Sequence, residues 1–117
     1  MVTDKPLVWV GSSRKDVQVL PEDVKDVFGF ALRYAQRGQK HPKAKPLRGF
    51  GGAGVLEVVE NHDGDTFRAV YTVRFADTVY VLHVFQKKSK SGIKTPDREL
   101  EVIRKRLRLV IEERENG

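Results

Sequence analysis

The sequence predicts one α/β (α+β) domain spanning residues 1–117, with a curved antiparallel sheet, N-terminal helices on one face of that sheet and a C-terminal helix. Apolar residues recur at three- and four-residue spacing between positions 20 and 35, which indicates an amphipathic helix. Strand-like segments joined by tight turns follow between positions 55 and 85. A second helical stripe comes last, so the predicted element order is β-α-α-β-β-β-α.

The N-terminal half is expected to hold one short strand and then helix. Residues 7–10 form an apolar run that stops at Gly11. Pro21 suits the first turn of a helix, so we expect two helical pieces that meet near Leu20 rather than one unbroken rod. Gly38 is a typical C-terminal stop for the second piece.

A loop with two prolines and four glycines, residues 41–54, leads into the predicted sheet. Strands are expected at residues 55–60, 66–75 and 79–85. Asp63-Gly64 predicts a hairpin turn between the first two, and Ala76-Asp77 a second tight turn. The unbroken apolar run of the last strand indicates burial on both faces. The predicted core contains Val27, Phe28, Tyr71, Val73, Leu82, Val84 and Leu107.

The final helix is expected to begin at Thr95-Pro96-Asp97. Thr95 is the predicted cap, Pro96 occupies the first position, and Asp97 complements the helix dipole. The apolar stripe of this helix comprises Leu100, Ile103, Leu107, Val110 and Ile111.

The net charge of +6 and pI of about 9.7 favour a polyanionic partner, either RNA or DNA, or an acidic protein. The charge is uneven, because residues 32–50 contain bases and no acid, whereas residues 57–65 are acidic. This pattern indicates a directional binding face. The chain has no cysteine and no apolar run of membrane-spanning length, so we expect a cytoplasmic protein without disulfides or membrane contact.

A cationic group at the end of the last strand is the candidate site. Lys87, Lys88 and Lys90 follow the apolar run with no acid among them, and Ser89 and Ser91 add hydroxyls. Clustered ammonium groups beside hydroxyls predict a phosphate-binding device. A solvated lysine-rich loop that only aids solubility is the alternative interpretation.

The chemistry that fits these residues is RNA cleavage without metal or other cofactor, because RNA supplies its own nucleophile, the ribose 2′-hydroxyl. The three histidines lie far apart and cysteine is absent, so no metal site is expected. Arg68 and Lys87 are predicted to hold the scissile phosphate. Flanking phosphates are assigned to Arg74, Lys88 and Lys90.

Two further residues are candidates for substrate binding. Phe85 shares strand parity with Lys87 and can stack on a base, and His83 shares the same parity. Core packing is the alternative for Phe85, and a buried structural role is the alternative for His83. Arg68 and Arg74 lie on one face of their predicted strand, but the sequence does not fix the register that would align this face with Lys87.

Four segments together resemble the phage-related, HigB-like branch of the RelE/ParE toxin superfamily of type II toxin–antitoxin systems. These segments are ALRYAQRGQ, KPLRGFGGAGVLEVVE, FRAVYTV and VLHVFQKKSKSGIKTP. The resemblance runs from about residue 7 to residue 109 and implies a RelE-like fold. Arg68 matches the arginine of the family's central strand, and Lys87 and Lys88 match its Lys-Lys pair. Glu57 and Tyr71 match the pattern as structural residues.

The resemblance also implies a function. HigB-like toxins are ribosome-dependent mRNA endonucleases that inhibit translation and need no metal. Their partners are the ribosome, mRNA and a cognate antitoxin, often a helix-turn-helix protein, through which the complex binds operator DNA. A ParE-like gyrase inhibitor is the alternative, as is a non-catalytic nucleic-acid-binding module. RelE has a C-terminal tyrosine that this chain lacks, so the general base stays open.

Overall fold

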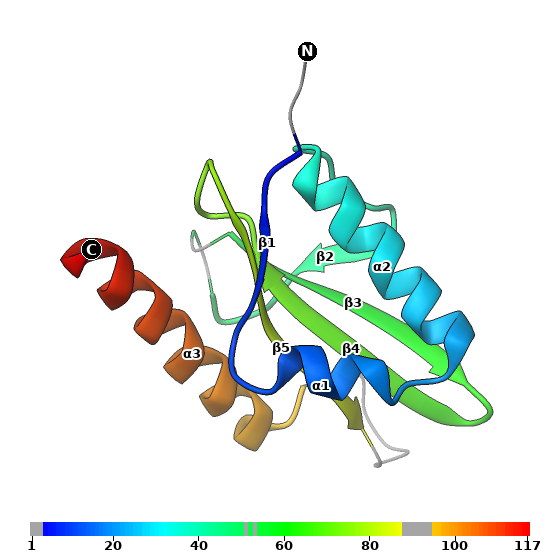
Figure 1. Ribbon diagram of the computed structural model, residues 1–117. Helices are drawn as coiled ribbons and strands as arrows, with labels where there is room; N and C mark the ends of the chain where they lie inside the picture. The colour runs from blue at the N-terminus through cyan, green and yellow to red at the C-terminus, as the bar shows by residue number, and fades with distance from the viewer. Residues whose placement is uncertain (1–3, 51, 53, 88–94) are drawn as a thin grey trace.

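The computed structural model describes residues 4–50, 52, 54–87 and 95–117. Within these residues the chain forms a five-stranded sheet with three helices (Figure 1). The predicted α+β class is therefore confirmed. The strands are β1 (Leu7–Trp9), β2 (Ala44–Pro46), β3 (Val55–His62), β4 (Asp65–Thr72) and β5 (Val79–Lys87). The helices are α1 (Ser13–Gln18), α2 (Glu22–Gln36) and α3 (Asp97–Asn116).

The sheet has the order β1-β5-β4-β3-β2. Strands β3 to β5 pair antiparallel, as predicted, and β2 pairs antiparallel with β3, whereas β1 lies parallel to β5 at one edge. The short strand β2, inside the predicted loop, was missed by the sequence analysis. Pro46 is tolerated there because β2 is an edge strand with one side free of ladder bonds.

The hairpin between β3 and β4 follows the predicted Asp63-Gly64 turn. Both residues have positive φ, 50° and 82°, as a tight two-residue turn requires. The far end of β4 differs from prediction, because the strand stops at Thr72 rather than at residue 75. The Thr72 hydroxyl accepts a hydrogen bond from the Arg74 N–H, so a local side-chain contact replaces the strand ladder.

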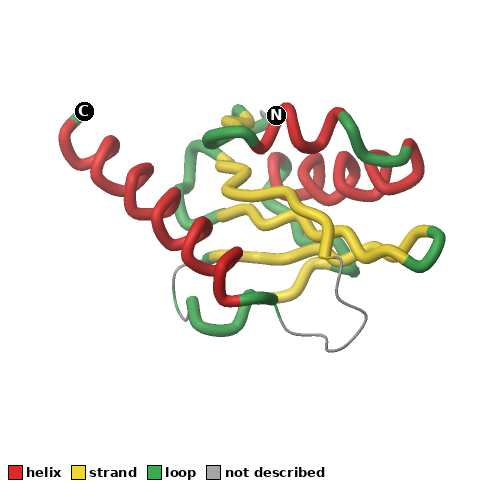
Figure 2. Tube along the Cα trace, turned by 90° about the horizontal axis from the view of Figure 1, so that it is seen from below, coloured by secondary structure: helices red, strands yellow, loops and turns green. Residues whose placement is uncertain are grey.

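The two faces of the sheet carry separate apolar clusters (Figures 1 and 2). Helices α1 and α2 cover one face, which we call the helix-pair face, and α3 crosses the other, the α3 face. Of the predicted core residues, five are buried and Val27 and Val73 are partly buried. The five are Phe28, Tyr71, Leu82, Val84 and Leu107.

The helix boundaries confirm one prediction and correct another. Two helical pieces do meet near Leu20, with Pro21 as the N-terminal boundary residue of α2. Thr95, however, is not the cap of α3; Pro96 occupies that position and no side chain caps the helix. The Thr95 hydroxyl instead donates a hydrogen bond to Glu57 on β3. No helix in the described part of the chain is both long and apolar enough to cross a membrane.

Candidate nucleic-acid interface

The register of β4 and β5 places the predicted site residues on one face of the sheet. Arg68 lies opposite Phe85, and Lys87 lies opposite Thr66, two residues along β4. Paired residues in an antiparallel sheet point the same way, so Arg68, Phe85 and Lys87 share the α3 face. The Cα atoms of Arg68 and Lys87 are diagonal neighbours, roughly 7 Å apart. The sequence had left this alignment open.

At the centre of this face, Arg68 is joined to an acid and a hydroxyl. Its Nη1 lies 3.0 Å from Glu57 Oε1 and 3.4 Å from Thr95 Oγ1. Thr95 in turn donates to Glu57 Oε2 at 2.7 Å. Arg68 is 4% exposed and the Glu57 side chain 13%, so the group is nearly withdrawn from solvent. These contacts fix the Glu57 carboxylate through both oxygens, which is what a positioned acid–base group requires.

Lys87 ends β5 beside this group and is 7% exposed. A lysine ammonium that is this buried retains few of its water contacts and interacts strongly with nearby charge. Lys88 and Lys90, which the sequence assigns to the same site, lie outside the described residues.

His83 is anchored through both ring nitrogens. Nε2 lies 3.1 Å from Glu99 on α3, and Nδ1 lies 3.4 Å from Arg106 Nη1, also on α3. Its ring stacks on Phe85 with centroids 4.7 Å apart. Burial lowers the pKa of His83, the Arg106 charge adds to this effect, and Glu99 opposes it. These contacts agree with the structural role that the sequence left open for His83.

Arg74 is separated from the other predicted residues. It follows the end of β4, whereas Lys87 pairs with the beginning of that strand. The separation along the strand is roughly 20 Å or more at about 3.3 Å per residue. The alternation that was expected to align Arg74 with Arg68 ends at Thr72, because the chain leaves the sheet there. Arg74 therefore lies far along the strand from Lys87, and its assignment to a flanking phosphate stays a prediction.

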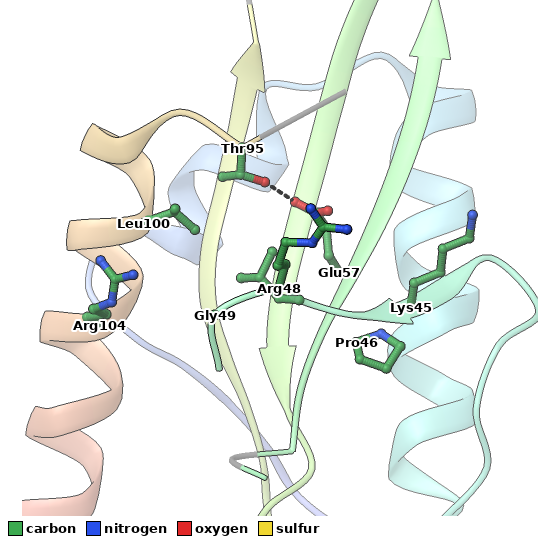
Figure 3. A pocket seen from close by; sticks show the side chains of 9 residues that line it. Lys45, Pro46, Arg48, Gly49, Glu57, Thr95, Leu100 and Arg104 are labelled. Carbon is green, nitrogen blue, oxygen red and sulfur yellow. Dashed lines mark hydrogen bonds between the residues drawn. The ribbon is translucent and has the colours of Figure 1, made fainter. Parts of the chain in front are cut away.

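An open cavity of about 530 Å³ adjoins Glu57 and Thr95 (Figure 3). Figure 3 shows Arg104 of α3 on one side, Lys45 of β2 on the other, and Arg48 between them. The remaining lining residues are Pro46, Leu47, Gly49 and Leu100. Sequence reasoning did not assign any of these residues to a site, although Lys45 and Arg48 belong to the acid-free basic segment, residues 32–50.

Metal-ligating residues do not gather near this cavity. Among the described residues, no group of three or more histidine, cysteine, aspartate or glutamate side chains is placed to hold an ion. The chemistry that these residues offer is a fixed carboxylate, a guanidinium, an ammonium and a hydroxyl beside a cationic cavity. Such a set suits recognition of a phosphate-containing ligand.

Comparison with known proteins identifies the family. The family model described as "Phage derived protein Gp49-like" matches residues 15–108, which is most of the chain. The chain belongs to this family. This Gp49-like protein is also similar to a chain of the toxin–antitoxin complex RelBE2 from Mycobacterium tuberculosis. The identity is 24%, the TM-score is 0.48, and the match covers 73% of this chain and 100% of the other. No curated protein matches the sequence.

Proposed function

We propose that this Gp49-like protein is the toxin of a type II toxin–antitoxin system and cleaves mRNA on the ribosome without a metal ion. The observation that carries the proposal is the Glu57–Arg68–Thr95 group, which lies on the same sheet face as Lys87 and at the wall of a cationic cavity. The sequence segments that resemble HigB-like toxins add support, since they contain Glu57, Arg68 and Lys87.

In the proposed reaction, Glu57 acts as the general base that the sequence analysis left open. Its carboxylate takes the proton from the ribose 2′-hydroxyl, and the 2′-oxygen forms a bond to phosphorus. The bond from phosphorus to the 5′-oxygen breaks, and the leaving oxygen keeps the electron pair and takes a proton from water. The products are a 2′,3′-cyclic phosphate and a free 5′-hydroxyl.

The cationic residues stabilise the charge that develops on the phosphate. Arg68 holds Glu57 through Nη1, and its guanidinium places a positive charge beside the carboxylate. Lys87 supplies a second positive charge on the same face. A donor of this kind typically contributes about a hundredfold or more to the rate. Phe85 and His83 support this face from β5, and Lys88 and Lys90 remain candidates for flanking phosphates.

A toxin of this class needs an inhibitor in the same cell. We propose a cognate antitoxin, of the helix-turn-helix type that the resemblance implies, with an acidic or amphipathic segment that covers the basic face. Operator DNA would be bound only through that complex, and the place of action is the cytoplasm, where ribosomes and mRNA are. Co-expression with the adjacent reading frame should yield a co-purifying complex and restore growth.

The decisive experiment is induction in growing cells followed by primer extension on mRNA. The wild-type protein should stop growth and produce new 5′ ends inside translated codons. Glu57→Gln should abolish these cuts, because an amide cannot accept the proton, while the protein stays folded. Glu101→Gln, which removes an exposed acid from α3, is the matched control and should cut like the wild type.

Other outcomes would reject the proposal. Intact mRNA together with relaxed or broken DNA would favour the ParE-like alternative, gyrase inhibition. Cuts that persist in folded Glu57→Gln would exclude Glu57 as the base, and cuts that depend on an added metal ion would exclude the metal-free reaction. Normal growth with intact mRNA and DNA would favour a non-catalytic binding module.

A further inference from the structure

Some lysines and arginines of the described residues form ion pairs, and the three cations that line the cavity do not. Lys43 pairs with Glu60 at 2.8 Å and Arg114 with Asp77 at 2.8 Å. In contrast, no acid within the described ranges forms an ion pair with Lys45, Arg48 or Arg104. Single unpaired cations are common on protein surfaces. What distinguishes these three is that separate parts of the chain bring them to one cavity.

Local structure holds these cations around the cavity. Lys45 lies on β2 directly opposite Glu57 of β3, so it shares the α3 face. Arg104 projects from α3, where its guanidinium lies 5.4 Å from the Phe50 ring centroid in a cation–π contact. Arg48 lies in the turn between them, which closes through the hydrogen bond from Phe50 N–H to Leu47 carbonyl.

The cavity is suited in size and lining to a nucleotide unit. Its volume of about 530 Å³ lies within the range typical of small-molecule sites. Pro46, Leu47 and Leu100 add apolar surface between the cations. A ligand with both anionic groups and flat apolar rings uses both kinds of lining. Single-stranded RNA has this chemistry, because its bases are free of a partner strand and can contact protein side chains.

We propose that Lys45, Arg48 and Arg104 form a binding groove for single-stranded RNA, in which they hold backbone phosphates next to the bond that is cleaved. This inference rests on the proposed function for its choice of RNA. The groove adjoins Glu57 and Thr95 directly, so an RNA strand that places its scissile phosphate at Glu57 continues into it. The only acid that lines the cavity within the described residues is Glu57, whose charge Arg68 and Thr95 already offset.

The test is a binding measurement that does not depend on cleavage. Fluorescence anisotropy with a short 2′-O-methylated oligoribonucleotide gives affinity on a probe that lacks the nucleophile. The groove variant is Lys45→Ala/Arg48→Ala/Arg104→Ala. Its matched control is Lys15→Ala/Arg14→Ala/Arg33→Ala, which removes one lysine and two arginines that are exposed on α1 and α2.

The groove variant should bind at least about tenfold more weakly at low salt. Its plot of log K against log salt should also be less steep by about 2, which is about 0.7 for each lost phosphate contact. The control should change little. Equal losses in both variants, or no binding by the wild type, would overturn the inference. So would a groove variant that keeps RNA binding but loses the antitoxin, because the groove would then belong to an acidic protein segment.

The same measurements separate this inference from the proposed function. If the wild type binds the probe through the groove but leaves unmodified mRNA uncut on ribosomes, the proposed nuclease activity fails while the groove stands. If mRNA is cut and the groove variant both binds and cuts like the wild type, the groove assignment fails while the nuclease proposal stands.

Discussion

The two faces of the sheet bury different kinds of side chain. The helix-pair face buries apolar side chains against α1 and α2, with Phe28, Val58 and Tyr71 fully enclosed. The α3 face also has an apolar cluster, which includes Leu82 and Ile103. It also buries three basic side chains, Arg68, His83 and Lys87, together with the hydroxyl of Thr95.

This difference supports the site that we propose on the α3 face. A buried charge costs several kcal/mol in lost hydration unless a partner compensates it, and apolar packing in the same place is often at least as stable. Stability alone therefore gives no reason to bury Arg68 and Glu57 on the α3 face. The reason is instead functional, in our proposal, because the reaction needs a fixed carboxylate beside a cation. Functional sites are where a fold departs from its simplest packing.

The largest effect on stability is expected on the helix-pair face. Phe28→Ala should lower the free energy of unfolding by about 3–5 kcal/mol, because Phe28 is fully buried against the sheet and its removal leaves a cavity. Phe30→Ala on the same helix is the control; Phe30 is 60% exposed and its loss should change stability by about 0.5 kcal/mol or less. Urea unfolding measures both. Similar values for the two variants would contradict the burial of Phe28 against the sheet.

Substitutions on the α3 face should instead lower the rate of mRNA cleavage. Arg68→Lys keeps the charge but loses the planar fork, and Lys87→Ala removes the second cation; each should lower mRNA cleavage by about a hundredfold or more. Because Arg68 is buried in an ion pair, lysine is a milder test than alanine, which would leave Glu57 without its guanidinium. Cleavage is measured by primer extension, and folding and antitoxin binding by circular dichroism and co-purification. Undiminished cleavage by folded variants would reject the site.

The sequence predicts the parts of this comparison that depend on local pattern. Turn chemistry at Asp63-Gly64 and the apolar run of β5 were sufficient to place the meander. The site depends on contacts that local pattern does not encode. Thr95 looks like a helix cap in sequence, yet it binds Glu57, 38 residues away. Strand register, which turn geometry and packing decide together, brings Arg68 and Lys87 to one face and leaves Arg74 outside.

A pH titration should distinguish His83 as a structural group of the α3 face. The pKa of His83 in the folded protein is lowered, mainly by burial, so protonation favours the unfolded chain. Its contribution to stability is complete above the unfolded pKa of about 6.5 and is lost as the pH falls below that value. Melting temperatures from about pH 7.5 to about pH 5 should therefore fall more steeply for the wild type than for His83→Gln. Equal slopes would mean that His83 does not titrate with folding.

On the helix-pair face, Tyr71 offers a smaller test. Its hydroxyl is buried and has no hydrogen-bond partner within the described part of the chain, and burial raises its pKa to about 12. Tyr71→Phe removes an unsatisfied polar group, so stability should stay the same or rise by up to about 1 kcal/mol. The raised pKa means that wild-type stability declines as the pH rises from about 10 through 12, and the variant should lack that part of the decline. A large loss of stability in Tyr71→Phe would show that the hydroxyl has a partner.

The smallest effect should come from Lys43→Ala, because Lys43 is close to the cationic cavity in sequence but does not line it. Lys43 precedes β2 and is only two residues from Lys45, but its ammonium pairs with Glu60 in an exposed position. Exposed ion pairs contribute about 0–1 kcal/mol, so Lys43→Ala should leave unfolding nearly unchanged. It should also leave cleavage within about twofold of the wild type, whereas Lys45→Ala should weaken RNA binding and flatten its salt dependence. Because each substitution removes one lysine and the two positions are only two residues apart, total charge cannot explain a difference between them. Equal loss of RNA binding would show that the charge of the whole basic segment matters, and not the three side chains that line the cavity.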